Sequence, residues 1–170
     1  MPDLTTRTQL LEEISARLAD EGATEAGLRG VLDRVLAHFD CAVGTIHSLD
    51  PASNLLRLRA GRGIPDSILK PVQTIPIGKG MAGIAAERRA PVQVCNLQSD
   101  SSGVAKPAAR DTKMEGSVAV PMLVDGDLRG VLGVAKPVPY DFSEAETNLL
   151  LEVASAIGRC LGVTAERTQP

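Results

Sequence analysis

The fold is decided by the stretch Ser117-Val118-Ala119-Val120-Pro121-Met122-Leu123-Val124-Asp125-Gly126-Asp127-Leu128-Arg129-Gly130-Val131-Leu132-Gly133-Val134-Ala135. Two runs rich in aliphatic residues, 117–124 and 128–135, flank the pair Asp125-Gly126. An Asp-Gly pair between two such runs is typical of the tight turn that joins antiparallel strands. The sequence therefore predicts a β-hairpin here.

Two amphipathic helices are predicted before any strand, over residues 6–20 and 25–39. Apolar residues recur at helical spacing in both, and the two stripes are Leu10, Leu11, Ile14 and Leu18, then Leu28, Val31, Leu32, Val35, Leu36 and Phe39. Thr6 and Gln9 resemble a capping box for the first helix.

Shorter elements are expected in the middle of the chain: strands over 41–49, 55–60 and 72–77, a helix over 80–88 and a strand over 92–95. Pro76 restricts the third of these strands to an edge or a bulge. The polar segment 96–116 is too long for an ordinary connection, and loops of this length are usually functional or mobile.

The last helix has a well-marked start. Ser143 stands at its N-cap, Glu146 stands at the reciprocal position of a capping box, and Gly162 is its predicted end. Its apolar stripe is Leu149, Leu150, Val153, Ile157, Cys160 and Leu161. Helices at both ends with hairpins between them predict an α+β fold with an antiparallel sheet rather than βαβ units.

Composition excludes several classes of partner. The chain has 170 residues, of which 44% are hydrophobic and 23% charged, which predicts one soluble globular domain. It has one Tyr, two Phe and no Trp, and its net charge is −3, so we expect no base-stacking surface and no basic field for nucleic acid or anionic lipid. No apolar run reaches membrane length, and the N-terminus lacks the features of a signal peptide.

The cysteines and histidines do not suggest a metal centre. Cys41, Cys95 and Cys160 are odd in number and form no CxxC pair, which indicates reduced thiols and a cytoplasmic location. We expect Cys95 to be buried in a strand, with a reactive thiol beside the polar segment as the alternative. His38 and His47 are expected to be satisfied or exposed side chains rather than ligands of a metal.

Residues Gly78-Lys79-Gly80-Met81-Ala82-Gly83 fit the GxGxxG pattern of a dinucleotide-binding loop, with Asp100 at about the spacing of a ribose-binding acid. Pro76 before the loop and the short helix after it disfavour that interpretation. The simplest alternative is that the glycines let the start of a helix approach a sheet closely. A third is that the free N–H groups of the helix start, with Lys79, bind an anion or a polar ligand.

Five segments in succession resemble those of a GAF domain: 75–83, 90–94, 117–126, 129–134 and 142–146. The resemblance covers roughly residues 24–162. It implies a six-stranded antiparallel sheet with the first and last helices packed on one face. On the other face it implies a small-molecule pocket, roofed by the short helix after Gly80 and the long loop after Cys95. It also implies a sensory or regulatory role in bacterial signalling, in a dimer joined through the terminal helices.

Two branches of this family can be compared residue by residue. Members that bind cyclic nucleotides carry Asn-Lys, a Phe and Asp-Glu, where this chain has Ala135-Lys136, Phe142 and Glu146-Thr147, which argues against such a ligand. Members that reduce free methionine sulfoxide use three cysteines, and those positions carry Val72, Ala82 and Lys106. A thiol must attack the sulfoxide, so this activity is not expected. Bilin- and haem-binding members need a Cys or His at the pocket, and neither histidine is an obvious candidate.

We therefore expect a non-catalytic, ligand-sensing domain, standing alone or excised from a larger signalling protein. Its expected parts are a helical dimerisation segment over 1–23, the GAF domain over 24–162 and a disordered tail over 163–170. The candidate ligand-binding residues are Gly80, Met81, Ala82, Cys95, Asn96, Ser99, Asp100, Lys106, Met114, Ser117 and Val118. The ligand and any cofactor stay unnamed, and an effector domain or protein partner would receive the signal. The alternatives are a ligand-free dimerisation or docking module, and a thiol-dependent reductase that uses Cys95.

Overall fold

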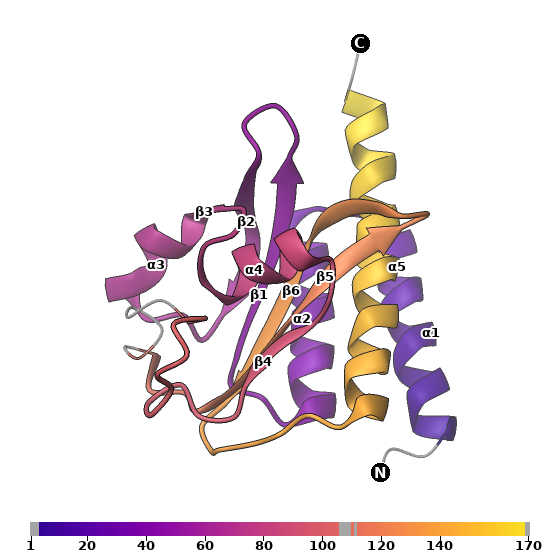
Figure 1. The fold of residues 1–170 in the computed structure, drawn as a ribbon. Helices are drawn as coiled ribbons and strands as arrows, with labels where there is room; N and C mark the ends of the chain where they lie inside the picture. Colours follow the sequence, from indigo (N-terminus) through magenta and orange to yellow (C-terminus); the bar gives the residue numbers. More distant parts are fainter. Residues whose placement is uncertain (1–3, 106–109, 111, 169–170) are drawn as a thin grey trace.

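A computed structural model describes residues 4–105, 110 and 112–168 of the chain (Figure 1). The elements follow in the order α1 Leu4–Glu21, α2 Glu25–Phe39, β1 Val43–Asp50, β2 Leu55–Arg62, α3 Asp66–Gln73, β3 Thr74–Pro76, α4 Gly80–Arg88, β4 Val92–Val94, β5 Gly116–Val124, β6 Asp127–Lys136 and α5 Glu144–Thr168. Within this described part, no helix combines the length and the apolar character needed to cross a membrane.

The hairpin of β5 and β6 forms as predicted. Asp125 and Gly126 both have positive φ, 52° and 85°, as the tight turns that match the twist of paired strands require. The pairing runs from Val124 opposite Asp127 to Gly116 opposite Lys136. Further antiparallel pairs extend it to a six-stranded sheet in the order β3-β2-β1-β6-β5-β4. The prediction of an α+β fold with an antiparallel sheet is confirmed.

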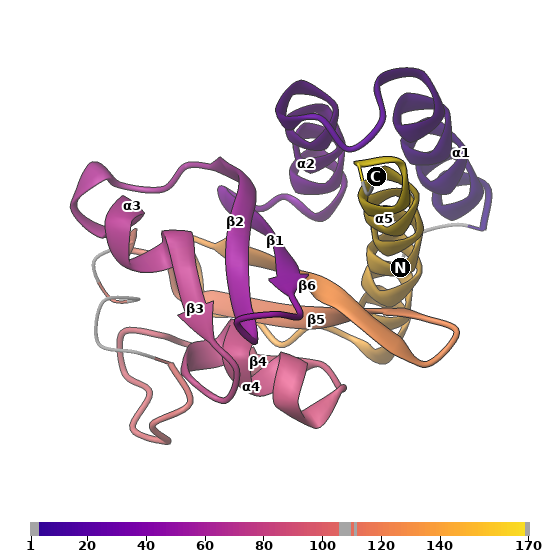
Figure 2. The same ribbon diagram turned by 90° about the horizontal axis from the view of Figure 1, so that it is seen from above.

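One face of the sheet, here called the helical face, is covered by α2 and α5, and α1 packs on the outside against both (Figure 2). The predicted capping box starts α5, because the Glu146 N–H donates to Ser143 Oγ at 3.1 Å and the Ser143 N–H donates to Glu146 Oε1 at 2.9 Å. The largest fully buried residues of the core on this face are aliphatic: Leu10, Ile14, Leu28, Leu32, Ile46, Met122, Leu132, Leu149, Leu150 and Ile157.

The apolar stripe of α1 is buried inside the molecule. Leu10, Ile14 and Leu18 are 1%, 0% and 8% exposed. Two ion pairs also attach α1 to α5 and to α2: Arg7–Glu152 and Glu13–Arg34. The stripes that we expected to mediate a dimer, on α1 and on α5, are therefore already covered within one chain.

The opposite face, here called the cavity face, carries α3, α4 and the described part of the connection between β4 and β5 (Figures 1 and 2). Its buried cluster is much smaller and half alanine: Leu56, Ala85, Ala86, Val92, Ala119 and Val131. Small side chains fill little volume, so this face leaves space between the sheet and its cover.

Residues 66–73 form α3, and the strand predicted over 72–77 shrinks to Thr74–Pro76 at the edge of the sheet. The prediction failed because eight residues are too few to show a helical period and because Pro71 lies inside the helix. The local start signal is Asp66 in the first turn, where a carboxylate suits the helix dipole.

Both terminal helices are longer than predicted. α1 begins at Leu4, so Thr6 and Gln9 lie inside the helix and do not cap its start. α5 passes Gly162 and continues to Thr168, through most of the segment expected to be a disordered tail. One glycine costs a helix only about 1 kcal/mol relative to alanine, and a helix already nucleated continues past it at that cost.

Candidate functional site

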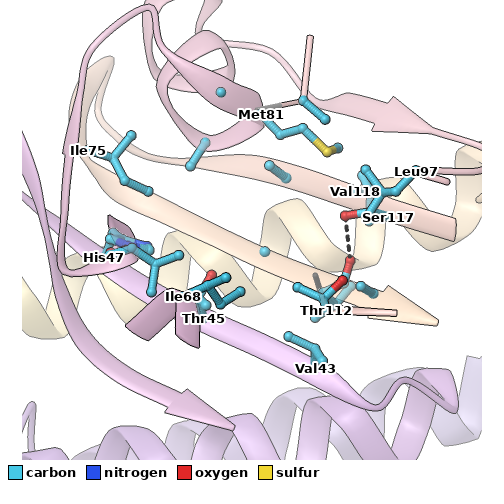
Figure 3. Close-up of a pocket in the computed structure, with 18 of the residues that line it drawn as sticks. Val43, Thr45, His47, Ile68, Ile75, Met81, Leu97, Thr112, Ser117 and Val118 are labelled. Carbon is cyan, nitrogen blue, oxygen red and sulfur yellow. Dashed lines mark hydrogen bonds between the residues drawn. The ribbon is translucent and has the colours of Figure 1, made fainter. Parts of the chain in front are cut away.

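A cavity of about 180 Å³ lies on the cavity face, between the sheet and the cover formed by α3 and α4 (Figure 3). Its described lining is largely aliphatic: Val43, Thr45, His47, Ile68, Pro71, Val72, Ile75, Lys79, Gly80, Met81, Ala82, Leu97, Ala105, Thr112, Ser117, Val118, Ala119, Gly133, Val134 and Ala135. An apolar space with a few converging polar groups is the usual form of a small-molecule site.

The strand β1 supplies one wall by simple alternation. Val43, Thr45 and His47 line the cavity, whereas Ile46 packs in the core of the helical face. Successive side chains of a strand point to opposite faces, so one strand serves both sides of the sheet. Of the described residues in the cavity lining, Lys79 is the only one with a permanent charge.

The glycine motif is explained by backbone geometry. Gly78 and Gly80 have φ of +87° and +67°, which disfavours residues with a side chain. A Cβ on Gly83 would lie 2.4 Å from the Pro76 carbonyl oxygen, so only glycine lets α4 approach β3 this closely. Because β3 is an antiparallel edge strand, the loop is not part of a parallel βαβ unit. The interpretation as a close approach of a helix start to a sheet is confirmed.

The start of α4 faces the cavity. Its first three residues, Gly80, Met81 and Ala82, all line the wall, and no side chain caps the helix at Lys79. The first N–H groups of a helix have no partner within the helix and carry a partial positive charge. This wall therefore offers hydrogen-bond donors to a polar group of a ligand.

His47 is a polar residue of the site that sequence reasoning missed. It is 1% exposed, and its Nε2 lies 2.7 Å from the carbonyl oxygen of Val72 in α3. A carbonyl only accepts, so Nε2 carries the hydrogen and donates it. Burial lowers the pKa of His47, which keeps the ring neutral near pH 7. Nδ1 then has a free lone pair, and no group in the described part of the chain donates to it.

The signal for His47 was present in the sequence. Its spacing of two from Thr45 and of four from Val43 places all three residues on one face of a strand. Figure 3 shows His47 beside Ile68 and Ile75 at one end of the cavity. The cover over this end of β1 is α3, a helix that the sequence does not predict, so nothing in the sequence indicates that His47 is buried.

Five of the eleven predicted ligand-binding residues lie on the cavity wall: Gly80, Met81, Ala82, Ser117 and Val118. Ser117 brings a hydroxyl, which donates to the Val134 carbonyl over a long 3.4 Å. Lys106 lies outside the described residues. Contact of any of these residues with a ligand stays a prediction.

Five other predicted residues belong to the connection after β4 and are absent from the described lining: Cys95, Asn96, Ser99, Asp100 and Met114. Several of their polar groups hold the connection together. Asn96 Oδ1 accepts from the Gln98 N–H at 3.0 Å, and Asp100 Oδ2 accepts from Ser102 at 2.8 Å. Cys95 is exposed rather than buried, because β4 ends at Val94.

The residues shared with cyclic-nucleotide-binding members lie on the helical side. Lys136 is 6% exposed, donates to the carbonyls of Phe39 and Asp40 at the end of α2, and lies 4.4 Å from the centre of the Tyr140 ring. Glu146 accepts from the Tyr140 hydroxyl at 2.7 Å. These residues close the end of α2 and fix the start of α5, which is a structural role.

No thiol lines the described cavity. Val72 and Ala82, at two of the positions where the reductase branch has cysteines, are both on its wall. Cys41 is half-buried near α2, and burial raises its pKa to about 11, which makes it a poor nucleophile. The described residues also contain no cluster of three His, Cys, Asp or Glu side chains that suits a metal ion.

Comparison with solved structures finds close matches of fold at low sequence identity. The GAF domain of a phosphoenolpyruvate-protein phosphotransferase from Coxiella burnetii aligns with a TM-score of 0.83 at 16% identity, over 98% of each chain. The corresponding domain from Acinetobacter gives 0.77 at 18% identity, also over 98% of each chain. A free methionine-R-sulfoxide reductase from Neisseria meningitidis, solved with its substrate, gives 0.77 at 19% identity, over 99% of this chain and 96% of that one.

At these identities the likeness shows the fold and nothing of the activity, because the same fold occurs both in a domain of a phosphotransferase and in a methionine sulfoxide reductase. A search among curated proteins gives no match. The family model described as "GAF domain" matches residues 24–161, most of the chain. Together with the six-stranded antiparallel sheet and its one-sided helical layer, this match establishes that the chain belongs to the GAF domain family.

Proposed function

We propose that this chain is a non-catalytic regulatory domain that senses a small molecule bound in the cavity face of its sheet. The observation that carries the proposal is the cavity itself: about 180 Å³ of space, lined mostly by aliphatic residues, on the opposite side of the sheet from the large aliphatic core. A domain that served only for docking would have no reason to keep this space. Filling it would stabilise the fold.

The size of the cavity limits the ligand. An apolar cavity of about 150 Å³ holds one benzene molecule, so the space here suits a ligand of about six to eight non-hydrogen atoms. Ala135 stands where cyclic-nucleotide-binding members have Asn, which disfavours a cyclic nucleotide.

The competing function is an enzyme, because a methionine sulfoxide reductase has the same fold. Sulfoxide reduction needs a thiolate that attacks sulfur and a second thiol that resolves the product. The described cavity wall offers Val72 and Ala82 instead, and Cys95 is exposed outside it. These observations support binding without chemistry.

We further propose that occupancy is read out through a dimer, in a cytoplasmic bacterial signalling system. The terminal helices remain the proposed contact, although their buried stripes do not provide it. The backbone of α5 continues past Leu161 to Thr168 and projects beyond the sheet (Figure 1). Pairing of this end with a second copy would connect the domain to an effector. Equilibrium sedimentation at high micromolar concentration contradicts this part if it finds only monomers.

The ligand is tested first by native mass spectrometry of the full chain, purified without additives. A retained molecule of small mass supports sensing, and Ala82→Phe, which fills the cavity, abolishes its retention. Ala16→Phe, on the exposed side of α1, is the matched control and leaves retention unchanged. Retention that survives Ala82→Phe places the molecule elsewhere and contradicts the proposal.

The enzyme alternative has its own assay. We expect no consumption of free methionine-R-sulfoxide when the chain is incubated with a dithiol reductant. Turnover that disappears in Cys95→Ser would establish the reductase and contradict the non-catalytic function. If the sulfoxide is consumed no faster with the chain than with the reductant alone, the result supports the regulatory proposal.

A further inference from the structure

One residue of the cavity wall has a buried acceptor atom with no donor. His47 is 1% exposed, and Nδ1 has no hydrogen-bond partner in the described part of the chain. A buried polar atom left unpaired costs about 1–3 kcal/mol, and the great majority of such atoms in proteins are paired. His47 belongs to the cavity wall, so a ligand whose donor reaches Nδ1 supplies the missing hydrogen bond.

The hydrogen bond to α3 fixes the tautomer of His47 and therefore which of its nitrogens is an acceptor. A neutral histidine can offer either nitrogen as the acceptor, depending on its tautomer. Here the Val72 carbonyl takes the hydrogen of Nε2 at 2.7 Å, so Nδ1 stays an acceptor. A ligand group that only accepts would meet lone pair against lone pair at this position, and a group with an O–H or N–H would be bound.

We propose that His47 is the specificity-determining residue of the cavity, and that the ligand is a small, mainly apolar molecule whose O–H or N–H group donates to Nδ1. This inference rests on the proposed function and names the class of its ligand. The aliphatic wall binds the body of the molecule. The donors of the α4 start lie on another wall, so acceptor groups of the same ligand have a separate place to bind.

The orientation of the His47 ring is fixed by contacts at its backbone and at its far end. Its backbone is paired with β6, where His47 lies opposite Val131, and a Cβ on Gly130 would come within 2.0 Å of the His47 carbonyl. The far end of the ring is tied to α3 through Val72. A ring fixed in this way discriminates well between ligands, because it cannot rotate away from an acceptor group without losing its hydrogen bond to Val72.

The test uses two probes of equal size, phenol with an O–H donor and fluorobenzene without one. Both are titrated into the full chain, and the imidazole nitrogens are followed by ¹⁵N NMR. The chain has two histidines, so His38, at the end of α2, serves as an internal reference. We expect phenol to shift His47 Nδ1, fluorobenzene to leave it unchanged, and neither to move His38.

Two substitutions isolate the acceptor. His47→Gln places an amide near the position of Nε2 and keeps a donor for Val72, but it has no acceptor at Nδ1. His47→Asn places an amide oxygen near Nδ1. We expect the ratio of phenol to fluorobenzene affinity to fall about five- to tenfold in His47→Gln and to be largely kept in His47→Asn, as the loss of one hydrogen bond predicts.

The outcomes separate the inference from the proposed function. If both probes bind but the ratio is the same in His47→Gln, the cavity is real and the inference is wrong. If an internal water on Nδ1 survives phenol binding, the inference is equally wrong. If neither probe binds the wild-type chain, the proposed function fails and the inference fails with it. If His47→Gln does not fold, the ¹⁵N shift of His47 Nδ1 on phenol binding to the wild-type chain tests the inference by itself.

Discussion

On the helical face of the sheet, α2 and α5 bury large aliphatic side chains against β1, β5 and β6, and α1 covers them in turn. On the cavity face, α3 and α4 cover the sheet with a small cluster rich in alanine and leave about 180 Å³ unfilled. The same strands supply both faces, since Ile46 and His47 are neighbours in β1 and point to opposite sides. The difference teaches that the packed face provides most of the stability and that the other face has room for the ligand we propose, so each can change with limited cost to the other.

The largest expected effect on stability comes from a substitution that creates a cavity in the packed helical face. Ile157 on α5 is fully buried, so Ile157→Ala should lower the free energy of unfolding by about 3–4 kcal/mol. The matched change Ile75→Ala only enlarges an existing cavity, and we expect a loss of about 1 kcal/mol. Urea denaturation of both variants measures the difference. Equal losses would mean that the two faces are packed alike, and the comparison would be wrong.

The packed face was also the predictable one. Its stripe from Leu28 to Phe39 and its hairpin turn at Asp125-Gly126 are repeated local signals, and the structure places each as expected. Signals of this kind are strong because many residues report the same period. The capping box of Ser143 and Glu146 was found for the same reason: its two residues satisfy each other locally.

The cavity face was predicted less well, because its structure depends on contacts between distant segments. α3 is short and contains Pro71, so no local period revealed it. Without α3, the burial of His47 and its bond to Val72 could not be foreseen. The residues after β4 were assigned to the pocket from family position, and the structure puts Leu97 on the wall rather than Asn96.

Lys136 provides the next largest effect and contrasts with His47. Both side chains are buried, but Lys136 Nζ donates to the Phe39 and Asp40 carbonyls and lies over the Tyr140 ring. Lys136→Met leaves these carbonyls unpaired, and we expect a loss of about 2 kcal/mol in urea denaturation. Lys70→Met, at an exposed site on α3, is the control and should cost under about 0.5 kcal/mol. A similar loss in both variants would contradict the role given to Lys136.

The pH dependence of stability tests the unpaired histidine. Burial holds the pKa of His47 below its usual 6.5 in the folded chain. Below pH 6.5 the unfolded chain binds this proton and the folded chain does not, so stability is complete above pH 6.5 and falls as the pH drops. The expected slope reaches about 1.4 kcal/mol per pH unit until the folded pKa is met.

The window between pH 6.5 and 5 isolates this effect, because the pKa values of Asp50 and Glu146 are lowered from 3.8 and 4.5 and these groups stay ionised there. His47→Gln should remove most of the slope, and the part that remains belongs to His38, whose pKa burial also lowers. An unchanged slope in His47→Gln would show that His47 is not buried neutral.

The smallest effect compares the same substitution on the two faces. Ser143→Ala removes the cap of α5 and should cost about 1 kcal/mol in thermal or urea unfolding. Ser117→Ala removes a hydroxyl from the cavity wall, where its bond to Val134 spans 3.4 Å, and should cost less than about 0.3 kcal/mol. Equal costs would make the Ser117 hydroxyl a structural group. A cost near zero leaves it free for a ligand, so that Ser117→Ala should alter the retention of the bound molecule rather than the stability of the fold.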